Sequence, residues 1–459
     1  MPRHETVLQA IIKSLNYIMY VMYAFIKGLV IPVFWGQKTY YWCTPPINRL
    51  RVMETAGDQK YKVLPQFLSS LAVSFGACNV GAWQSFTSVA LPKMMIETQE
   101  YNKTVDGEEN MFKVDLHVGS WIVSLFFLGT IAGCLTGGFF NQVLGPRRVF
   151  LFSSPIAALT WVMIAMSHRV WVVYLARIMA GFLFGTFQAN GKVYNAEIAH
   201  PELRGSLGTM ISNMAGLGAL YTFVLGYFIS SWRLVAWLLI APSIMLGVAV
   251  YFAPDSPYWL LEKGKEEEAR ASLRRLRGKN YNIDIEFEEM VKKKNAKNPN
   301  QSVFSILCSR LFFLPFIRIG SLMVITQWAG INVVSSYMVN IFQDSGISIN
   351  PLAAPILVSL VQISLSMVST LILRVSPRKP LFLVCASFIL LGFLVIGTHS
   401  FLTGGLSKEE SQSYGWLPVL GVTVVQSGRT VGFMAVIQLL IAESFPTQIR
   451  YAIQFCLRQ

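Results

Sequence analysis

The chain has 459 residues, 53% of them hydrophobic and 14% charged, with a formal net charge of +14 at pH 7. Because soluble globular proteins carry roughly a quarter charged residues, this composition excludes an ordinary soluble protein and indicates a membrane protein. The basic excess does not indicate nucleic-acid binding, since the lysines and arginines gather between apolar segments, where positive charge marks the cytoplasmic face.

Residues 1–60 precede the first long apolar segment and are predicted to be an N-terminal extension. Within them, the apolar stretch 7–35 is interrupted by Lys13 and Lys27, and the uncharged run between these lysines is too short to cross a bilayer comfortably. The pattern favours an interfacial helix whose lysines reach the headgroups. An extra membrane span, a signal peptide and an artefactual extension of the reading frame remain alternatives.

Ten apolar segments of membrane-spanning length follow, six before a charged stretch and four after it. The sequence therefore predicts an all-α, multi-pass membrane protein in three parts. These are a six-helix N-terminal bundle (61–255), a cytoplasmic linker with short helices (256–305) and an incomplete, four-helix C-terminal bundle (306–459). The predicted spans are 65–91, 117–140, 149–167, 171–191, 206–230, 233–253, 319–342, 352–373, 381–402 and 416–442.

Charge in the connecting segments predicts the topology. The segment 92–116 is predominantly acidic, whereas 262–300 is rich in lysine and arginine, which places the first outside the cell and the second in the cytoplasm. Asn102 begins an Asn-Lys-Thr sequon in the outer segment and is predicted to carry a glycan. The stretch 266–278, in which acids precede arginines, is predicted to form a soluble helix.

Groups that could support metal, cofactor or nucleophilic chemistry are scattered along the chain. The six cysteines form no CxxC pair and the five histidines are isolated, so the sequence predicts no disulfide framework, no metal site and no cofactor. It contains no phosphate-binding loop and no nucleophile–base constellation, which argues against an ATP-driven pump and against an enzyme.

Two kinds of residue stand out inside the predicted spans. The pairs Gly133…Gly137 and Gly181…Gly185 have the small-xxx-small spacing that allows helices to pack closely. Arg429 lies in the middle of a span, where a charge facing lipid would cost at least several kcal/mol. It is therefore expected to face a cavity or a partner, although no acidic residue is obviously placed deep enough to pair with it.

Two sequence motifs recur in the same order in both halves of the chain. "LGPRRVFLF" (144–152) corresponds to "VSPRKPLFL" (375–383), and "AEIAHPELRG" (196–205) corresponds to "AESFPTQIR" (442–450). The similar offsets indicate duplication of a six-span unit. Two more apolar segments follow the first copy but only nine residues follow the second, so two spans of the second bundle are expected to be missing.

Further motifs join these in chain order: "RIMAG" (177–181), "PDSPYWL" (254–260) and "QWAGIN" (327–332). Together they resemble the sugar porter family of the major facilitator superfamily, in particular its facilitated trehalose and hexose transporters. The resemblance runs from about residue 61 to 450. It implies a sugar carrier of the cell membrane that works by alternating access.

The resemblance also implies a group of charges at the inner face. In the family, acidic and basic side chains at span ends form ion pairs that latch the two bundles while the outer side is open. Such pairs need only a few kcal/mol to shift a two-state equilibrium. The residues predicted to form this inner-face network are Arg147, Arg148, Arg177, Glu197, Arg204, Arg378, Glu443 and Arg450.

A sugar site requires neutral amides and hydroxyls together with an aromatic surface. Gln327 and Asn332 match positions at which the family hydrogen-bonds substrate, but a spacing of five places them about 140° apart on an unbroken helix. A break near Gly330 would bring both toward one cavity; amides that join neighbouring helices are the alternative. The predicted substrate-binding residues are Gln327, Trp328, Gly330, Asn332, Tyr337, Ser212, Asn213, Gln362 and Gln438.

The chain departs from the family pattern at several positions. Gln142 and Leu373 stand where the family has a loop acid, and Tyr258 stands where it has an arginine. Gln438 replaces a tryptophan. These differences partly neutralise the expected inner latch and alter the aromatic surface for sugar.

The sequence thus supports two functions. The first is a sugar carrier for trehalose or a hexose, with uniport favoured over proton coupling because no carboxylate lies in the substrate region. The second is a non-transporting protein, either a truncated isoform or a sugar sensor, that associates with a full-length carrier. The partners predicted for the carrier are a small-molecule sugar and the lipid bilayer, with no nucleic acid.

Overall fold

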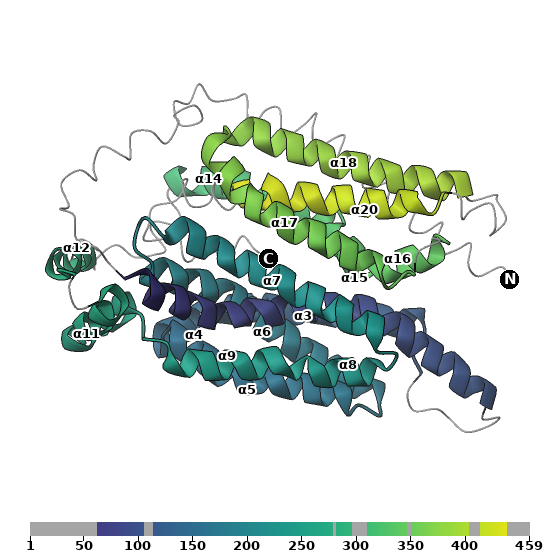
Figure 1. Ribbon diagram of the computed structural model, residues 1–459, viewed down its shortest axis with the longest axis horizontal. Helices are drawn as coiled ribbons and strands as arrows, with labels where there is room; N and C mark the ends of the chain where they lie inside the picture. Colours follow the sequence, from purple (N-terminus) through teal and green to yellow (C-terminus); the bar gives the residue numbers. More distant parts are fainter. Residues whose placement is uncertain are drawn as a thin grey trace. The chain divides into compact units, whose positions relative to one another are not determined.

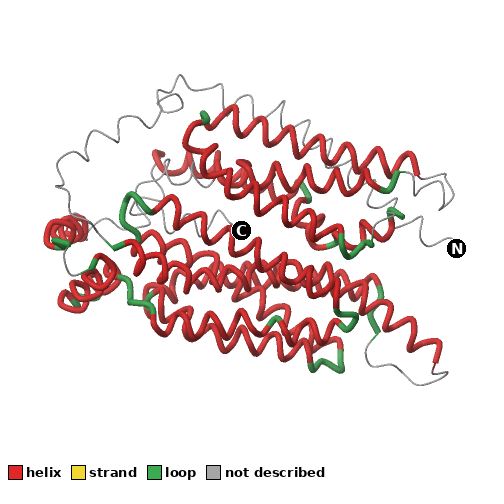
Figure 2. The backbone as a smooth tube through the Cα atoms, viewed as in Figure 1, coloured by secondary structure: helices red, strands yellow, loops and turns green. Residues whose placement is uncertain are grey.

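A computed structural model describes residues 62–104, 113–278, 281–295, 310–346, 350–403 and 414–437. All regular elements in these ranges are helices (Figure 1 and Figure 2). The chain divides into two compact units, an N-terminal unit that contains Val52–Ser309 and a C-terminal unit that contains Arg310–Phe445. Residues 1–60 and the predicted site residues Gln438, Glu443 and Arg450 lie outside the described ranges.

The N-terminal unit contains the helices predicted before the linker. Each predicted span coincides with a helix, or a helix pair, that is long and apolar enough to cross a membrane. The helices are α3 (Val63–Thr104), α4 (Leu116–Leu144), α5 (Pro146–Ala165), α6 (Val170–Ile198), α7 (Arg204–Phe228), and the consecutive pair α8 (Trp232–Leu238) and α9 (Ile240–Phe252).

Helix α3 differs from the prediction at its end. The sequence predicts an outer connecting segment from residue 92, whereas α3 continues to Thr104 and has 42 residues. A helix of this length measures about 63 Å, roughly twice the hydrocarbon thickness of a bilayer. Asn102 therefore lies in the last turns of a helix, and its glycosylation stays a prediction.

Glycines allow the main helix pairs of this unit to approach closely. A Cβ atom on Gly133 of α4 would lie 1.9 Å from the Phe182 carbonyl oxygen of α6, and one on Gly181 would lie 1.9 Å from the carbonyl oxygen of Phe126. Only a residue without a side chain fits at such contacts. The close packing predicted from the small-xxx-small pairs is confirmed.

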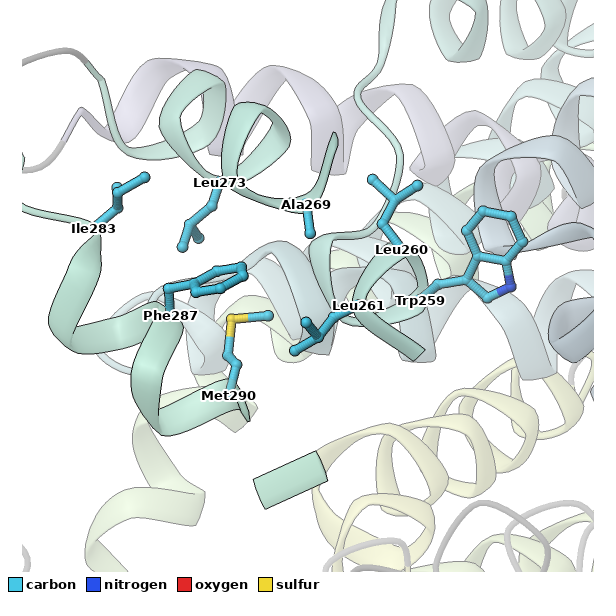
Figure 3. Close-up of a cluster of buried hydrophobic side chains, with 8 residues drawn as sticks. All are labelled: Trp259, Leu260, Leu261, Ala269, Leu273, Ile283, Phe287 and Met290. Atoms are coloured by element: carbon cyan, nitrogen blue, oxygen red, sulfur yellow. The ribbon is translucent and has the colours of Figure 1, made fainter. Parts of the chain in front are cut away.

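Among its described residues, the linker contains the short helices α10 (Pro257–Glu262), α11 (Glu266–Arg277) and α12 (Asp284–Asn295). Acids occupy the first turn of α11 and arginines its last turn, which complements the helix dipole. Figure 3 shows that Leu273 of α11 and Phe287 of α12 point toward each other. The buried cluster consists of Trp259, Leu260, Leu261, Ala269, Leu273, Ile283, Phe287 and Met290.

The described part of the C-terminal unit contains a group of packed helices and a helix that is interrupted. Helix α18 packs against α20, and α17 contacts α20 and the π-helical turn η3. The predicted span 319–342 is not one helix, because it is interrupted at Gly330. The elements are α14 (Arg310–Trp328), α15 (Ile331–Ser336), α16 (Met338–Asp344), α17 (Ala354–Val375), α18 (Arg378–Thr403), α20 (Trp416–Gly428) and η3 (Arg429–Phe433).

Candidate functional site

The helix break at Gly330 brings two predicted sugar-binding amides together. Gly330 has φ +76°, a left-handed conformation that glycine adopts readily. Across this turn, the Asn332 side-chain amide donates a hydrogen bond of 3.0 Å to the Gln327 side-chain carbonyl. The predicted break is confirmed. The Gln327 Nε2 and Asn332 Oδ1 atoms make no hydrogen bond with other described residues, so the pair keeps one donor and one acceptor group for a ligand.

A second polar cluster joins α15 to the end of α20. Gln426 Nε2 donates to the Ser335 hydroxyl at 2.7 Å. Arg429 Nη1 lies 3.3 Å from both the Ser335 hydroxyl and the Gln426 side-chain oxygen. Ser335 follows Asn332 by three residues, and side chains at this spacing are neighbours on a helix. The amide pair and the Arg429 cluster therefore share one side of α15.

A π-helical turn starts at Arg429. It runs from Arg429 to Phe433, and the Ser369 hydroxyl of α17 donates to the Val431 carbonyl at 2.6 Å. A π-turn leaves main-chain groups without their usual helical partners, and such turns occur frequently at functional sites. The expectation that Arg429 faces a partner is confirmed, but its partners are neutral side chains, not an acid.

The other predicted substrate residues of the C-terminal unit are more dispersed. Trp328 ends α14 with 68% of its surface exposed. Tyr337 is the part-buried residue between α15 and α16, and Gln362 is a part-buried residue of α17. In the described structure, no hydrogen bond joins Trp328 or Gln362 to the Gln327–Asn332 pair.

Two predicted residues lie in α7 of the N-terminal unit. Ser212 is exposed, whereas Asn213 is part-buried. The Asn213 side-chain oxygen is buried and has no hydrogen-bond partner among the described residues. An unsatisfied buried acceptor of this kind can accept a hydrogen bond from a ligand hydroxyl.

Two of the predicted inner-face charges of the N-terminal unit contact the end of α9 and the segment that follows it. Arg147 pairs with Asp255 at 3.0 Å and donates to the Tyr251 carbonyl at 2.7 Å. Glu197 accepts a hydrogen bond from the Ser256 hydroxyl. Asp255 and Ser256 lie in the "PDSPYWL" motif, which the sequence identified without assigning them these contacts.

The remaining predicted inner-face residues have varied surroundings. The Arg148 guanidinium lies 5.5 Å from the ring centre of Trp259, a cation–π contact. Arg204 is exposed at the start of α7, and Arg378 begins α18 in the other unit.

The assignment of Arg177 to the inner-face network is corrected by the structure. Arg177 is 1% exposed and lies twenty residues before Glu197 in α6, which corresponds to about 30 Å along the helix. Its donors are taken up by the main-chain carbonyls of Trp83 and Ile122 and by the Thr87 hydroxyl. Its guanidinium also stacks on Phe126 at 4.3 Å. Arg177 therefore joins α3, α4 and α6 at the far end of α6 from Glu197.

Arg277, which attaches the linker to the bundle, was not predicted from the sequence. Arg277 is 2% exposed and forms two hydrogen bonds with the Glu286 carboxylate, at 2.9 and 2.6 Å. It also donates to the Ile198 carbonyl at the end of α6, at 2.8 Å. Burial, together with the Arg277 charge, lowers the pKa of nearby His200 below its ordinary value. The spacing of Arg277 and Glu286 gave no signal, because they lie on different helices.

A second cluster that the sequence did not predict lies where α3 passes the α7–α8 turn. Lys93 Nζ donates to the carbonyls of Gly226 and Ile229, which end α7. Glu97 accepts hydrogen bonds from the side chains of Trp232 and Arg233. In the sequence, Lys93 and Glu97 were visible only as part of the predominantly acidic segment 92–116, and Arg233 only as the first residue of a predicted span.

The chain matches the family model described as "Sugar (and other) transporter" over residues 73–458. It is 29% identical over 390 residues to the facilitated trehalose transporter Tret1 of Polypedilum vanderplanki, covering 84% of this chain and 75% of that protein. It is 30% identical to Tret1 of Apis mellifera ligustica, covering 84% of this chain and 74% of that protein. It spans 46% of Tret1 of Aedes aegypti, at 28% identity.

Solved structures show the same fold. The partially occluded, inward-open form of the xylose transporter XylE from E. coli matches with a TM-score of 0.68 at 19% identity, over 86% of this chain and 90% of that chain. XylE bound to 6-bromo-6-deoxy-D-glucose, described as a proton:xylose symporter of the major facilitator superfamily, matches with a TM-score of 0.69 at 20% identity, over 87% of this chain and 86% of that chain.

The described residues contain eight helices that are long and apolar enough to cross a membrane. The curated relatives are transporters, which confirms that the chain is not an enzyme. The chain is a multi-pass membrane protein with the major facilitator fold, and it belongs to the sugar transporter family.

Proposed function

We propose that the chain carries a sugar across the membrane by facilitated diffusion, alternating between states open to either side. Family membership supports transport. The curated relatives are facilitated trehalose transporters, which supports a cargo built from hexose units: trehalose or a hexose.

The Gln327–Asn332 pair is the observation that carries this proposal. Sugar hydroxyls both donate and accept hydrogen bonds, and neutral amides match them without placing an uncompensated charge in the membrane. The pair lies at a helix break, which is where transporters of related architecture place their substrate sites. Gly330 is part of the site because it creates the break.

Transport is proposed to be passive. None of the hydrogen bonds of Gln327, Asn332, Arg429 or Arg177 to described residues involves a carboxylate. A proton-coupled carrier needs a group that takes up and releases a proton during the cycle, and carboxylates and histidines serve this purpose in pumps and transporters. Sugar flux should therefore not require a pH gradient.

The inner-face charges are proposed to stabilise the state that is closed to the cytoplasm. Arg147 and Glu197 are held at the ends of α5 and α6 by contacts with residues 255 and 256, which fixes where their charges stand. Arg148, Arg204, Arg378, Glu443 and Arg450 complete the proposed set of inner-face charges.

The test reconstitutes the full chain in liposomes and measures uptake of labelled trehalose and glucose. We expect saturable uptake, reduced about tenfold or more by Gln327→Ala or Asn332→Ala, because each removes a hydrogen bond to substrate. Gln343→Ala is the matched control, since Gln343 is an exposed amide of α16 in the same unit. Absence of saturable uptake of any hexose or disaccharide would refute the proposal and favour a non-transporting regulator.

A further inference from the structure

Arg177 and Arg429 both lie inside membrane-spanning helices, but their surroundings differ. Arg177 is almost fully buried, and its Nε, Nη1 and Nη2 atoms each donate to an oxygen of the N-terminal unit. The face of Phe126 covers its guanidinium. The hydrogen-bond donors of Arg177 are therefore used in contacts within the N-terminal unit.

Arg429 uses only one of its nitrogens. Its Nη1 makes two long contacts of 3.3 Å, and both acceptors are neutral. The Nε and Nη2 atoms donate to no described residue, and Arg429 forms no ion pair with a described carboxylate. Arg429 as a residue is part-buried. Arginine presents its donors as a planar fork that matches two oxygens of a carboxylate or phosphate.

The contact between Arg429 and Ser335 connects Arg429 to the helix that carries Asn332. Arg429 contacts Ser335, and Ser335 is one helical turn after Asn332 on α15. A molecule held by the amide pair through hydroxyls could thus present a charged group toward Arg429. A cation within the membrane is costly unless an anion or dipole compensates it, and here the neutral side chains supply weak compensation.

We propose that Arg429 binds the anionic group of an acidic sugar, a carboxylate or a phosphate on a hexose unit, while Gln327 and Asn332 bind its hydroxyls. This inference rests on the proposed function and specifies the class of cargo. Acidic hexose derivatives are then preferred to neutral hexoses of the same size. The alternative role, in which Arg429 only ties α15 to α20, does not produce such a preference.

The test measures the affinities of glucose, glucuronate and glucose 6-phosphate for the full chain in lipid nanodiscs. The wild type should bind at least one acidic sugar about tenfold or more tightly than glucose, and Arg429→Gln should abolish that ratio. Arg429→Lys should retain part of it because it keeps the charge. Arg274→Gln, which removes an exposed cytoplasmic arginine, is the matched control and should leave the ratio unchanged.

The outcomes separate this inference from the proposed function. Equal affinity for neutral and acidic sugars, or a preference that survives Arg429→Gln, overturns the inference and leaves sugar transport intact. Where Arg429→Gln fails to fold, Arg429→Lys decides: a preference that falls but persists supports the inference, and a preference that is unchanged overturns it. Glucuronate and glucose 6-phosphate distinguish a carboxylate from a phosphate site. Failure of every sugar to bind overturns both proposals.

Discussion

Arg277 illustrates how single residues hold the linker in place. Its guanidinium bridges the Glu286 carboxylate of α12 and the Ile198 carbonyl at the end of α6. Glu286 is largely buried as well, with 19% of its side chain exposed. A buried charge that loses its partner remains desolvated without compensation.

Replacing Arg277 by methionine should therefore destabilise the N-terminal unit. We expect a loss of about 3 kcal/mol or more, since one member of a buried, hydrogen-bonded ion pair is removed. Thermal unfolding of the purified protein in detergent measures the effect. Arg274→Met is the control, because Arg274 is exposed on the same helix. Equal unfolding midpoints for the two variants would contradict the role assigned to Arg277.

His200, beside Arg277, gives the protein a pH-dependent stability. Burial comes first and the Arg277 cation second in lowering the pKa of His200, while Glu286 and Glu202 oppose the shift. As the pH falls, His200 is therefore protonated more readily in the unfolded state than in the folded state. The free energy of unfolding should be unaffected above about pH 7 and should decrease as the pH falls below about 6.5, the ordinary pKa of histidine. Unfolding midpoints between these conditions should fall less in His200→Gln than in the wild type. Parallel pH profiles would refute this.

At the scale of elements, the α4–α6 contact depends on glycine. Gly133→Ala would place a Cβ atom 1.9 Å from the Phe182 carbonyl oxygen, so the helix backbones must separate. We expect destabilisation of about 1–3 kcal/mol. A Cβ atom added to Gly208 of α7 would meet no other atom within 4 Å, so Gly208→Ala should be neutral or stabilising by up to about 1 kcal/mol. Thermal unfolding of both variants measures the effect. A lower midpoint for Gly133→Ala alone indicates that packing controls stability at Gly133, whereas similar midpoints for both variants would contradict this.

The break between α14 and α15 depends on Gly330 in the same way. An alanine at φ +76° costs about 1–2 kcal/mol, which favours straightening the helix and separating Gln327 from Asn332. Gly330→Ala should therefore reduce sugar uptake more than it reduces the amount of folded protein. Gly397→Ala, at an uncrowded helical glycine of α18, is the control for uptake. Normal uptake by Gly330→Ala would show that the break is not required.

At the scale of the whole molecule, local patterns predicted the spans and missed most of the contacts between them. Apolar length predicted the eight described helices that are long and apolar enough to cross a membrane, whereas the predicted spans 319–342 and 352–373 are not among them. A glycine within "QWAGIN" predicted the helix break. Both features depend on residues that are neighbours in the sequence. Arg429 and Ser335 are far apart in sequence, so their contact could not be predicted from either segment.

The inner-face prediction was partly wrong for the same reason. Arg177 resembles a span-end cation in sequence, but its place is decided by acceptors from α3 and α4. The ion-pair partner of Arg147 is Asp255, which lies after the end of α9. Pairing of buried charges is a tertiary property, and a single sequence indicates only that a partner must exist.

Counterflow tests the central claim, an alternating-access sugar carrier, most directly. Liposomes containing the full chain are loaded with unlabelled trehalose or glucose and diluted into a trace of the labelled sugar, without a pH gradient. A carrier whose site faces one side at a time predicts transient accumulation of label above its equilibrium level, and Asn332→Ala should abolish it. Label that only rises to equilibrium, or does not enter at all, would contradict this mechanism.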